Sequence, residues 1–176
     1  MNFMLSGPSC SGKDALISYA LQEFKSITLP VLSTSRPRRP HETDGKDYFF
    51  VSMEVFQHSD SMVYYWQSHG FFYGYEKEKT AMKGNVILYY DMPSLDTAIH
   101  RPSQSVIMII DVAPGILEAR IRQYRNTEEV AKRLEDAQRW RQGMDAYKKK
   151  ADHVIENNDR LIDAQKRFVQ ILRTYL

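Results

Sequence analysis

A glycine-rich segment near the start of the chain has the residue types and spacing of a phosphate-binding loop. The segment GPSCSGK places Gly7, Gly12 and Lys13 in the pattern G-x-x-x-x-G-K. In such a loop the backbone N–H groups, here those of 9–13, wrap phosphate oxygens, and the following helix adds the positive end of its dipole. The lysine reaches the bridge between the β- and γ-phosphates. The pattern therefore predicts a site for a nucleoside triphosphate, with Lys13 facing solvent rather than packing.

The residue after Lys13 departs from the usual form of this loop. A Ser or Thr normally follows the lysine and binds the magnesium ion of the nucleotide, whereas this chain has Asp14. One interpretation is that Asp14 orients magnesium through a metal-bound water, since Mg²⁺ usually keeps several waters. The other is that a carboxylate simply favours the first turn of a helix. Both interpretations stay open.

Side chains that could hold a second phosphate lie further along the chain. Arg36, Arg38 and Arg39 are close neighbours, and Tyr48 follows them. Guanidinium forks and phenol hydroxyls can together surround a phosphate dianion, as transfer between two anionic phosphates requires. The alternative is a solvated basic turn. The phosphate loop elsewhere in the chain favours the first interpretation.

Short apolar runs alternate with amphipathic stretches in the elements that must position these groups. Runs of strand length lie at 2–6, 85–91, 105–111 and 152–157, and helical patterns lie at 13–24, from Pro114, at 127–150 and at 161–176. Continuous apolar strands are typical of a parallel sheet covered on both faces, in which sites lie at the carboxyl ends of strands. We therefore expect an α/β fold with a mainly parallel sheet flanked by helices.

The segment 33–83 differs from this alternation because it is aromatic and locally basic, with turn residues between its short runs. We interpret it as a small insert with its own strands, while 1–32 and 84–176 form the core of a single domain. Its aromatic residues are either a stacking wall for a base or simply the core of the insert. These residues are Tyr64, Tyr65, Trp66, Phe71, Phe72 and Tyr75.

The composition limits the class of protein. The chain has 176 residues, of which 43% are hydrophobic, and a formal net charge of +2. This suits one globular domain and gives no bulk charge for nucleic-acid binding. The single Cys10 cannot form an intramolecular disulfide, and the longest apolar run, 106–110, is far too short to span a bilayer. We expect a cytoplasmic protein that binds neither nucleic acid nor membrane.

Six segments together resemble guanylate kinases over nearly the whole chain. They are GPSCSGKD, STSRPRRPHETDGKDYFFV, GFFYGY, NVILYYD, EEVAKRL and DHVIENND, in the order and approximate spacing of that family. The second segment is the most specific, because it is similar to the family pattern S-T-T-R-x-P-R-x-G-E-x-x-G-x-D-Y. The resemblance implies a P-loop kinase fold that uses ATP and Mg²⁺, as a monomer or homodimer.

The resemblance also implies roles for individual residues, carried over position by position. Nucleotide binding falls to Gly7, Ser9, Ser11, Gly12, Lys13, Asp14, Ala15 and Asn157, with Asn157 near the donor adenine. Acceptor binding falls to Arg36, Arg39, Tyr48, Tyr73, Gly74 and Asp91. The arginine-rich segment 120–134 corresponds to the family's lid, which excludes water from the reaction. Arg120 and Arg133 of this lid, together with Lys13, are expected to be catalytic.

Three positions depart from the family's guanine-reading set. Where the family has a serine, a glutamate and a Ser or Thr, this chain has Leu32, Tyr64 and Tyr75. A phenol cannot present the paired acceptor of a carboxylate to the base, so we expect GMP to be a poor acceptor. The GKD loop and Trp66 resemble ribose 1,5-bisphosphate kinases instead. The prediction is an ATP-dependent phosphotransferase acting on a small phosphorylated acceptor, with a non-catalytic binding module of the same fold as the alternative.

Overall fold

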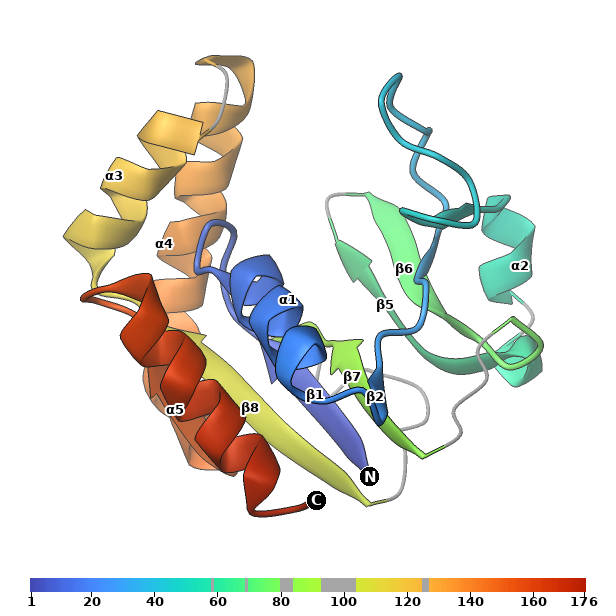
Figure 1. The fold of residues 1–176 in the computed structure, drawn as a ribbon. Helices are drawn as coiled ribbons and strands as arrows, with labels where there is room; N and C mark the ends of the chain where they lie inside the picture. The colour runs from blue at the N-terminus through green and yellow to red at the C-terminus, as the bar shows by residue number, and fades with distance from the viewer. Residues whose placement is uncertain (58, 69, 80–83, 93–103, 125–126) are drawn as a thin grey trace.

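A five-stranded parallel sheet forms the centre of the molecule (Figure 1). The computed structural model describes residues 1–57, 59–68, 70–79, 84–92, 104–124 and 127–176. The strands are β1 (Asn2–Ser6), β2 (Ile27–Thr28), β7 (Asn85–Tyr89), β8 (Ser105–Asp111) and β9 (His153–Glu156), in the order β2-β7-β1-β8-β9. Every neighbouring pair is parallel. The fold class expected from the sequence is therefore confirmed.

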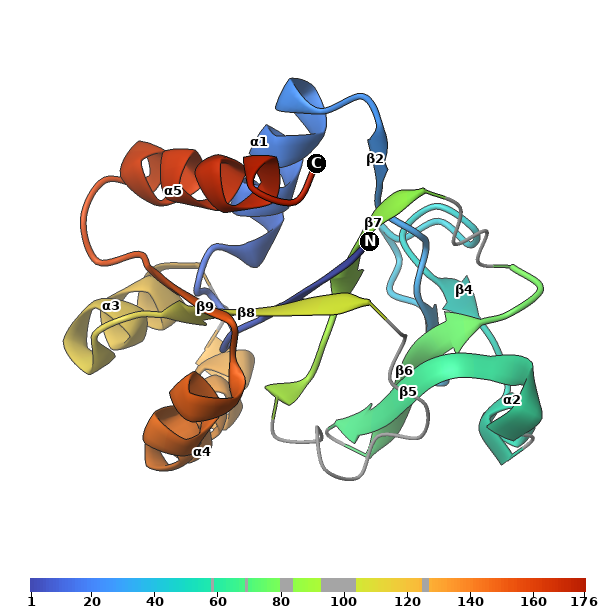
Figure 2. The same ribbon diagram turned by 90° about the horizontal axis from the view of Figure 1, so that it is seen from below.

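Helices cover both faces of this sheet, as Figure 2 shows. The helices are α1 (Lys13–Glu23), α3 (Pro114–Tyr124), α4 (Thr127–Lys150) and α5 (Leu161–Arg173). Alternate residues of β1 enter two different cores: Phe3 packs in one cluster with Leu16 of α1 and Phe168 of α5. Met4 packs in the other cluster with Trp140 of α4. The expected burial of these strands on both faces is confirmed.

A second, four-stranded sheet is built from the middle of the chain. It consists of β3 (Ser33–Thr34), β4 (Phe49–Phe50), β5 (Met62–Ser68) and β6 (Phe71–Glu76), in the order β4-β3-β6-β5. The short helix α2 (Met53–Gln57) and the 3₁₀ turn η1 (Ser59–Ser61) precede the β5–β6 hairpin. We call residues 33–79 the insert below, because residues 80–83 of the predicted segment lie outside the described residues.

The long elements agree with the sequence pattern, and small differences lie at their ends. The closing helix ends at Arg173 rather than at the last residue, and the strand predicted over 85–91 ends at Tyr89. No helix in the described parts of the chain is long and apolar enough to cross a membrane.

Candidate functional site

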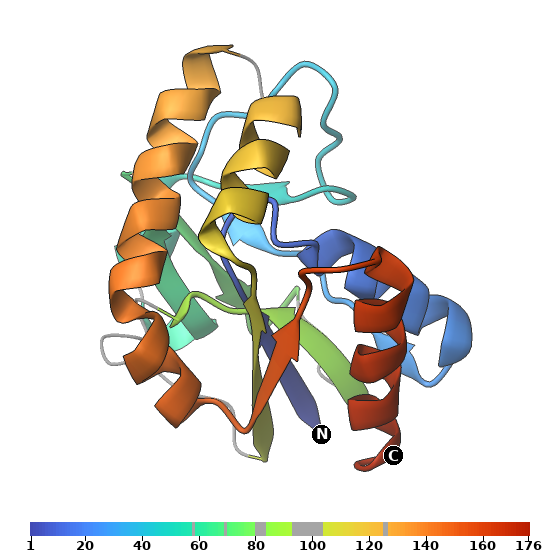
Figure 3. The same ribbon diagram turned by 90° about the vertical axis from the view of Figure 1, so that its left-hand side faces the viewer.

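One large cavity lies where the ends of β1 and β7, the insert and the helices α3 and α4 face one another. Its volume is about 1120 Å³. Figure 3 shows α3 and α4 side by side, and both contribute arginines to its lining. The segment between β1 and α1, from Gly7 to Gly12, lines the opposite part. The cavity therefore lies at the carboxyl ends of parallel strands, where sites in such sheets occur.

The loop after β1 has a backbone shape that requires glycine at its last position. Gly12 has a φ of 99°, in the left-handed region, and directly precedes α1. A Cβ atom there would lie 2.6 Å from the Asn157 side-chain nitrogen. That nitrogen donates a 2.8 Å hydrogen bond to the Ser11 carbonyl, so Asn157 braces the loop from the end of β9. The described residues offer no hydrogen-bond partner to the buried Ser11 hydroxyl.

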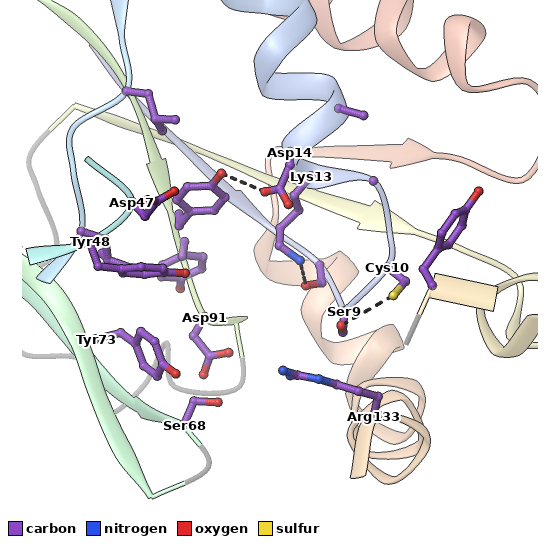
Figure 4. Close-up of a pocket in the computed structure, with 18 of the residues that line it drawn as sticks. Ser9, Cys10, Lys13, Asp14, Asp47, Tyr48, Ser68, Tyr73, Asp91 and Arg133 are labelled. Atoms are coloured by element: carbon purple, nitrogen blue, oxygen red, sulfur yellow. Dashed lines mark hydrogen bonds between the residues drawn. The ribbon is translucent and has the colours of Figure 1, made fainter. Parts of the chain in front are cut away.

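Lys13 folds back over the loop instead of extending into solvent. Its ammonium donates to the Gly7 carbonyl at 2.6 Å and to the Pro8 carbonyl at 2.9 Å (Figure 4). Burial lowers the pKa of Lys13, although the nearby Asp14 and Asp91 carboxylates raise it in part. The expectation of a solvent-facing lysine is wrong, because these two carbonyls hold the ammonium against the loop.

Asp14 makes a side-chain contact that the sequence pattern does not indicate. The Tyr89 hydroxyl donates a 2.9 Å hydrogen bond to its Oδ1 atom. Burial, and then the Asp14 charge, raises the pKa of Tyr89, so the phenol keeps its proton at neutral pH and is the donor.

The donor set near the loop suits magnesium bound mainly through phosphates. Asp14 and Asp91 both line the cavity, and the described residues hold no cluster of three metal-binding side chains. Mg²⁺ commonly takes one or two carboxylates with substrate phosphates and several waters. The residues present therefore fit a nucleotide-borne magnesium ion rather than an ion held by protein ligands alone.

The insert contributes arginines that already have acidic partners. The Arg36 guanidinium forms a fork with the buried Glu42 carboxylate, at 2.7 and 3.1 Å, and lies over the Tyr48 ring at 5.3 Å. Burial raises the pKa of Glu42, but the hydrogen bonds from Arg36 and from the Arg39 amide hold it below its usual value. The Arg39 guanidinium instead reaches Glu129 of α4 at 3.3 Å.

Phenol, hydroxyl and carboxylate groups face the loop across the cavity (Figure 4). Tyr48 and Tyr73 of the insert and Asp91 after β7 lie on one side, with Ser68 beside Tyr73. The Arg133 side chain points from α4 into the space between this group and the phosphate loop. Anion-binding groups thus surround a space that is open to both the loop and the insert.

Most of the site residues predicted from the sequence lie along this one cavity. Those in its lining are Gly7, Ser9, Gly12, Lys13, Asp14, Ala15, Arg36, Arg39, Tyr48, Tyr73, Asp91, Arg120, Arg133 and Asn157. Ser11 and Gly74 are buried beside it. Gly74 has a packing role, since a Cβ atom there would lie 2.5 Å from the side chains of Met62 and Tyr65. Adenine contact by Asn157 stays a prediction.

The sequence analysis missed two residues that organise the site, Glu42 and Tyr89. An acidic residue between two phosphate-binding arginines and a tyrosine could have pointed to Glu42. No local signal points to Tyr89, because its partner Asp14 is 75 residues away in the chain.

The two interpretations of the aromatic set each describe part of it. Tyr64 and Tyr75 are fully buried against the main sheet. Their hydroxyls accept hydrogen bonds from the backbone N–H groups of Asp91, at 3.4 Å, and Tyr89, at 2.8 Å. Trp66 instead lines the cavity and stacks on Tyr73, with ring centroids 5.8 Å apart. Core packing therefore holds for the two tyrosines, while Trp66 belongs to the cavity wall.

A parallel α/β sheet with a G-x-x-x-x-G-K loop between its first strand and helix is the architecture of P-loop kinases. The family model for guanylate kinase matches residues 2–175. The chain therefore belongs to the guanylate kinase family and is an enzyme of the nucleoside monophosphate kinase type.

Individual relatives agree with this assignment. The chain is 31% identical to a guanylate kinase of Thermotoga maritima, with 98% of this chain and 86% of the relative covered. It is 32% identical to a guanylate kinase of Symbiobacterium thermophilum, with coverages of 89% and 77%. The crystal structure of guanylate kinase from Anaplasma phagocytophilum superposes with a TM-score of 0.67 at 23% identity, over 99% of this chain and 85% of that one. This last likeness supports the fold.

Proposed function

We propose that this enzyme transfers the γ-phosphoryl group of ATP, with Mg²⁺, to a small phosphorylated acceptor. The observation that carries the proposal is the arrangement of the cavity. The loop with Lys13 lies on one side, and the insert with Arg39, Tyr48 and Tyr73 lies on the other. Two anionic ligands could therefore meet with their phosphates near Arg133, as direct transfer between them requires.

Catalysis would consist of positioning and charge stabilisation. The Lys13 ammonium has three N–H donors, of which two bind loop carbonyls, so the third is directed by the loop itself. Arg120 and Arg133 would stabilise the charge that develops on the transferring group. Magnesium, bound through the nucleotide phosphates beside Asp14, would neutralise further phosphate charge. These roles require no covalent protein intermediate.

At the acceptor end the two arginines are unequal. Arg36 uses its fork on Glu42 and a further N–H on the Pro37 carbonyl. Arg39 makes one long ion pair among the described residues, and its side chain is 39% exposed. Arg39 is therefore the better placed of the two to bind the acceptor phosphate, and Arg36 acts mainly through the rings of Tyr48 and Phe50 that it covers.

The acceptor itself is where this chain is expected to differ from its relatives. Relatives named guanylate kinase make GMP the first acceptor to test. However, Leu32 has no polar side-chain atom, and the buried hydroxyls of Tyr64 and Tyr75 are engaged with backbone N–H groups. None of these groups is available to the donors on guanine's edge, and an unpaired buried donor costs about 1–3 kcal/mol. We propose that GMP is a poor substrate.

A phosphorylated sugar is the second candidate acceptor, and Trp66 favours it. The indole lines the cavity, and Ser68 and Asp91 add oxygen atoms nearby. A flat ring beside hydrogen-bonding oxygens suits the faces and hydroxyls of a pentose as well as it suits a base.

An acceptor screen tests the proposal. Purified protein is incubated with MgATP and GMP, guanosine or mono- and bisphosphorylated pentoses, and ADP release is measured. We expect ADP only with acceptors that carry a phosphate, and a lower kcat/KM for GMP than for another acceptor. A kcat/KM for GMP in the usual range of about 10⁴ to 10⁸ M⁻¹s⁻¹ would contradict the altered acceptor. No ADP with any acceptor, together with stabilisation by ATP, would favour the binding module.

A matched pair of variants assigns the acceptor end. Arg39→Ala should raise the KM for the acceptor and leave ATP affinity unchanged. Arg38→Ala is the control, because Arg38 donates to the Glu42 backbone carbonyl rather than lining the cavity. Equal loss of ATP affinity in Arg39→Ala would move Arg39 out of the acceptor site.

A further inference from the structure

A chain of hydrogen bonds leads from the buried core to Asp14 in the phosphate loop. The hydroxyl of the fully buried Tyr75 accepts a 2.8 Å hydrogen bond from the Tyr89 backbone N–H. Tyr89 is the last residue of β7, and its backbone pairs in register with Leu5 of β1. Its own hydroxyl then donates the 2.9 Å hydrogen bond to Asp14 Oδ1. The phenol that contacts Asp14 is thus anchored by the sheet and by the core.

This anchoring restricts a side chain that would otherwise be free to turn. A first-turn aspartate at the surface of a helix can occupy several rotamers. With Oδ1 held by Tyr89, the carboxylate has one orientation, and Oδ2 is the oxygen left for other partners. Figure 4 shows Asp14 beside Lys13, at the edge of the cavity that the loop lines. The hydrogen bond also draws charge from a carboxylate that would otherwise repel bound phosphates.

Groups that orient a metal-associated carboxylate can be nearly as important as the carboxylate. Fixing such a group by a hydrogen bond to its second oxygen typically changes metal affinity by about 10- to 100-fold. A carboxylate that acts through a metal-bound water depends on its direction in the same way. If Asp14 were only a helix-start residue, its link to Tyr89 would have no consequence for magnesium.

We propose that Tyr89 is a positioning residue for magnesium, and that its hydroxyl holds the Asp14 carboxylate toward the metal–phosphate part of the cavity. The inference rests on the proposed use of MgATP. It extends that proposal by assigning the unusual Asp14 and a tyrosine from another strand to one functional unit.

The test is ATP binding as a function of magnesium, measured by isothermal titration calorimetry without acceptor. The variants are Tyr89→Phe, which removes only the hydroxyl, Asp14→Ala, Asp14→Asn and the double variant Asp14→Ala/Tyr89→Phe. Tyr65→Phe is the control, since it removes a hydroxyl from the insert, where Tyr65 packs on Phe56 and Phe72. Melting temperatures of all variants are measured in parallel.

We expect Tyr89→Phe to raise the magnesium concentration for half-maximal ATP affinity by about 3- to 10-fold, below the range for direct second-shell partners. ATP affinity in EDTA should remain at the wild-type value or rise. Asp14→Ala and Asp14→Asn should shift the magnesium midpoint at least as far, and the double variant should match Asp14→Ala. The control should overlap with the wild type.

Two results would overturn the inference while the proposed function stands. In the first, Tyr89→Phe has the wild-type magnesium midpoint although wild-type ATP binding depends on magnesium. In the second, Tyr89→Phe shifts the midpoint equally with Asp14 present or replaced by alanine, so that the hydroxyl acts without Asp14. By contrast, wild-type protein whose ATP affinity is the same in magnesium and EDTA would contradict the use of MgATP, and the inference with it.

Discussion

The Arg39 guanidinium lies 3.3 Å from the Glu129 carboxylate and so joins the insert to the first turn of α4. The two side chains are 39% and 32% exposed. Half-exposed pairs of this kind contribute no more than about 1 kcal/mol. Because Arg39 is the arginine that we assign to the acceptor phosphate, Glu129 competes with the acceptor for the same guanidinium.

Glu129→Gln should therefore lower the KM for the acceptor. The expected effect is at most about fivefold, which corresponds to the loss of a competing pair of about 1 kcal/mol. ATP affinity should not change. Steady-state kinetics with varied acceptor give the measurement, and Glu135→Gln, at an exposed position of α4, is the control. A higher KM in Glu129→Gln would mean that the ion pair supports the active arrangement instead.

Lys13→Ala should abolish phosphoryl transfer without unfolding the protein. The ammonium is held by two loop carbonyls, and removing one such charge from a transition state typically costs about 100- to 1000-fold in kcat. Lys25→Ala, at an exposed position after α1, is the control. Both variants should retain the far-UV circular dichroism of the wild type. Turnover within a few-fold of wild type in Lys13→Ala would contradict the role of the loop.

Glu42→Gln should destabilise the protein at neutral pH and have little effect in acid. The pKa of Glu42 is lowered in the folded state, so its charge stabilises the fold above the unfolded-state pKa of about 4.3. That contribution is lost as the pH falls through the lower, folded-state pKa. Melting temperatures of wild type and variant at pH 7 and in acid provide the measurement. A difference that stays constant with pH would exclude the charged pair with Arg36 as its cause.

The long elements of the main sheet could be predicted because their sequences carry a continuous pattern. The run 106–110 is buried throughout in β8, and the closing helix buries Ala164, Phe168 and Leu172 at helical spacing. The strands β2, β3 and β4 have two residues each, and two residues show no periodicity. Their existence depends on pairing with distant strands.

The site divides in a similar way. Residues within one motif, such as Gly12, Lys13 and Arg39, could be assigned because their spacing itself defines the chemistry. The roles of Glu42 and Tyr89 depend on contacts that only the folded chain creates. The burial of Tyr64 likewise depends on the main sheet that covers its side of β5, and strand alternation alone does not say which face of the insert is covered.

That burial changes what substitution at Tyr64 is expected to do. Tyr64→Glu would introduce the carboxylate that reads guanine in the family, but it would do so in an apolar cluster with Met4, Leu88 and Tyr90. Tyr64→Phe should cost about 1 kcal/mol of stability, because it removes only a hydroxyl with one long hydrogen bond. Tyr64→Glu should cost more, since a buried carboxyl without a partner resists ionisation.

The pH dependence of unfolding separates these two effects. Burial raises the pKa of a carboxyl, so Tyr64→Glu should lose further stability as the pH rises above about 4.3, where the unfolded chain ionises. Tyr64→Phe should follow the wild type at every pH. Urea unfolding at pH 5 and pH 8 measures the difference, and the same samples can be assayed with GMP. A Tyr64→Glu protein of wild-type stability at both values, with a clear gain in GMP turnover, would mean that this position faces the acceptor after all.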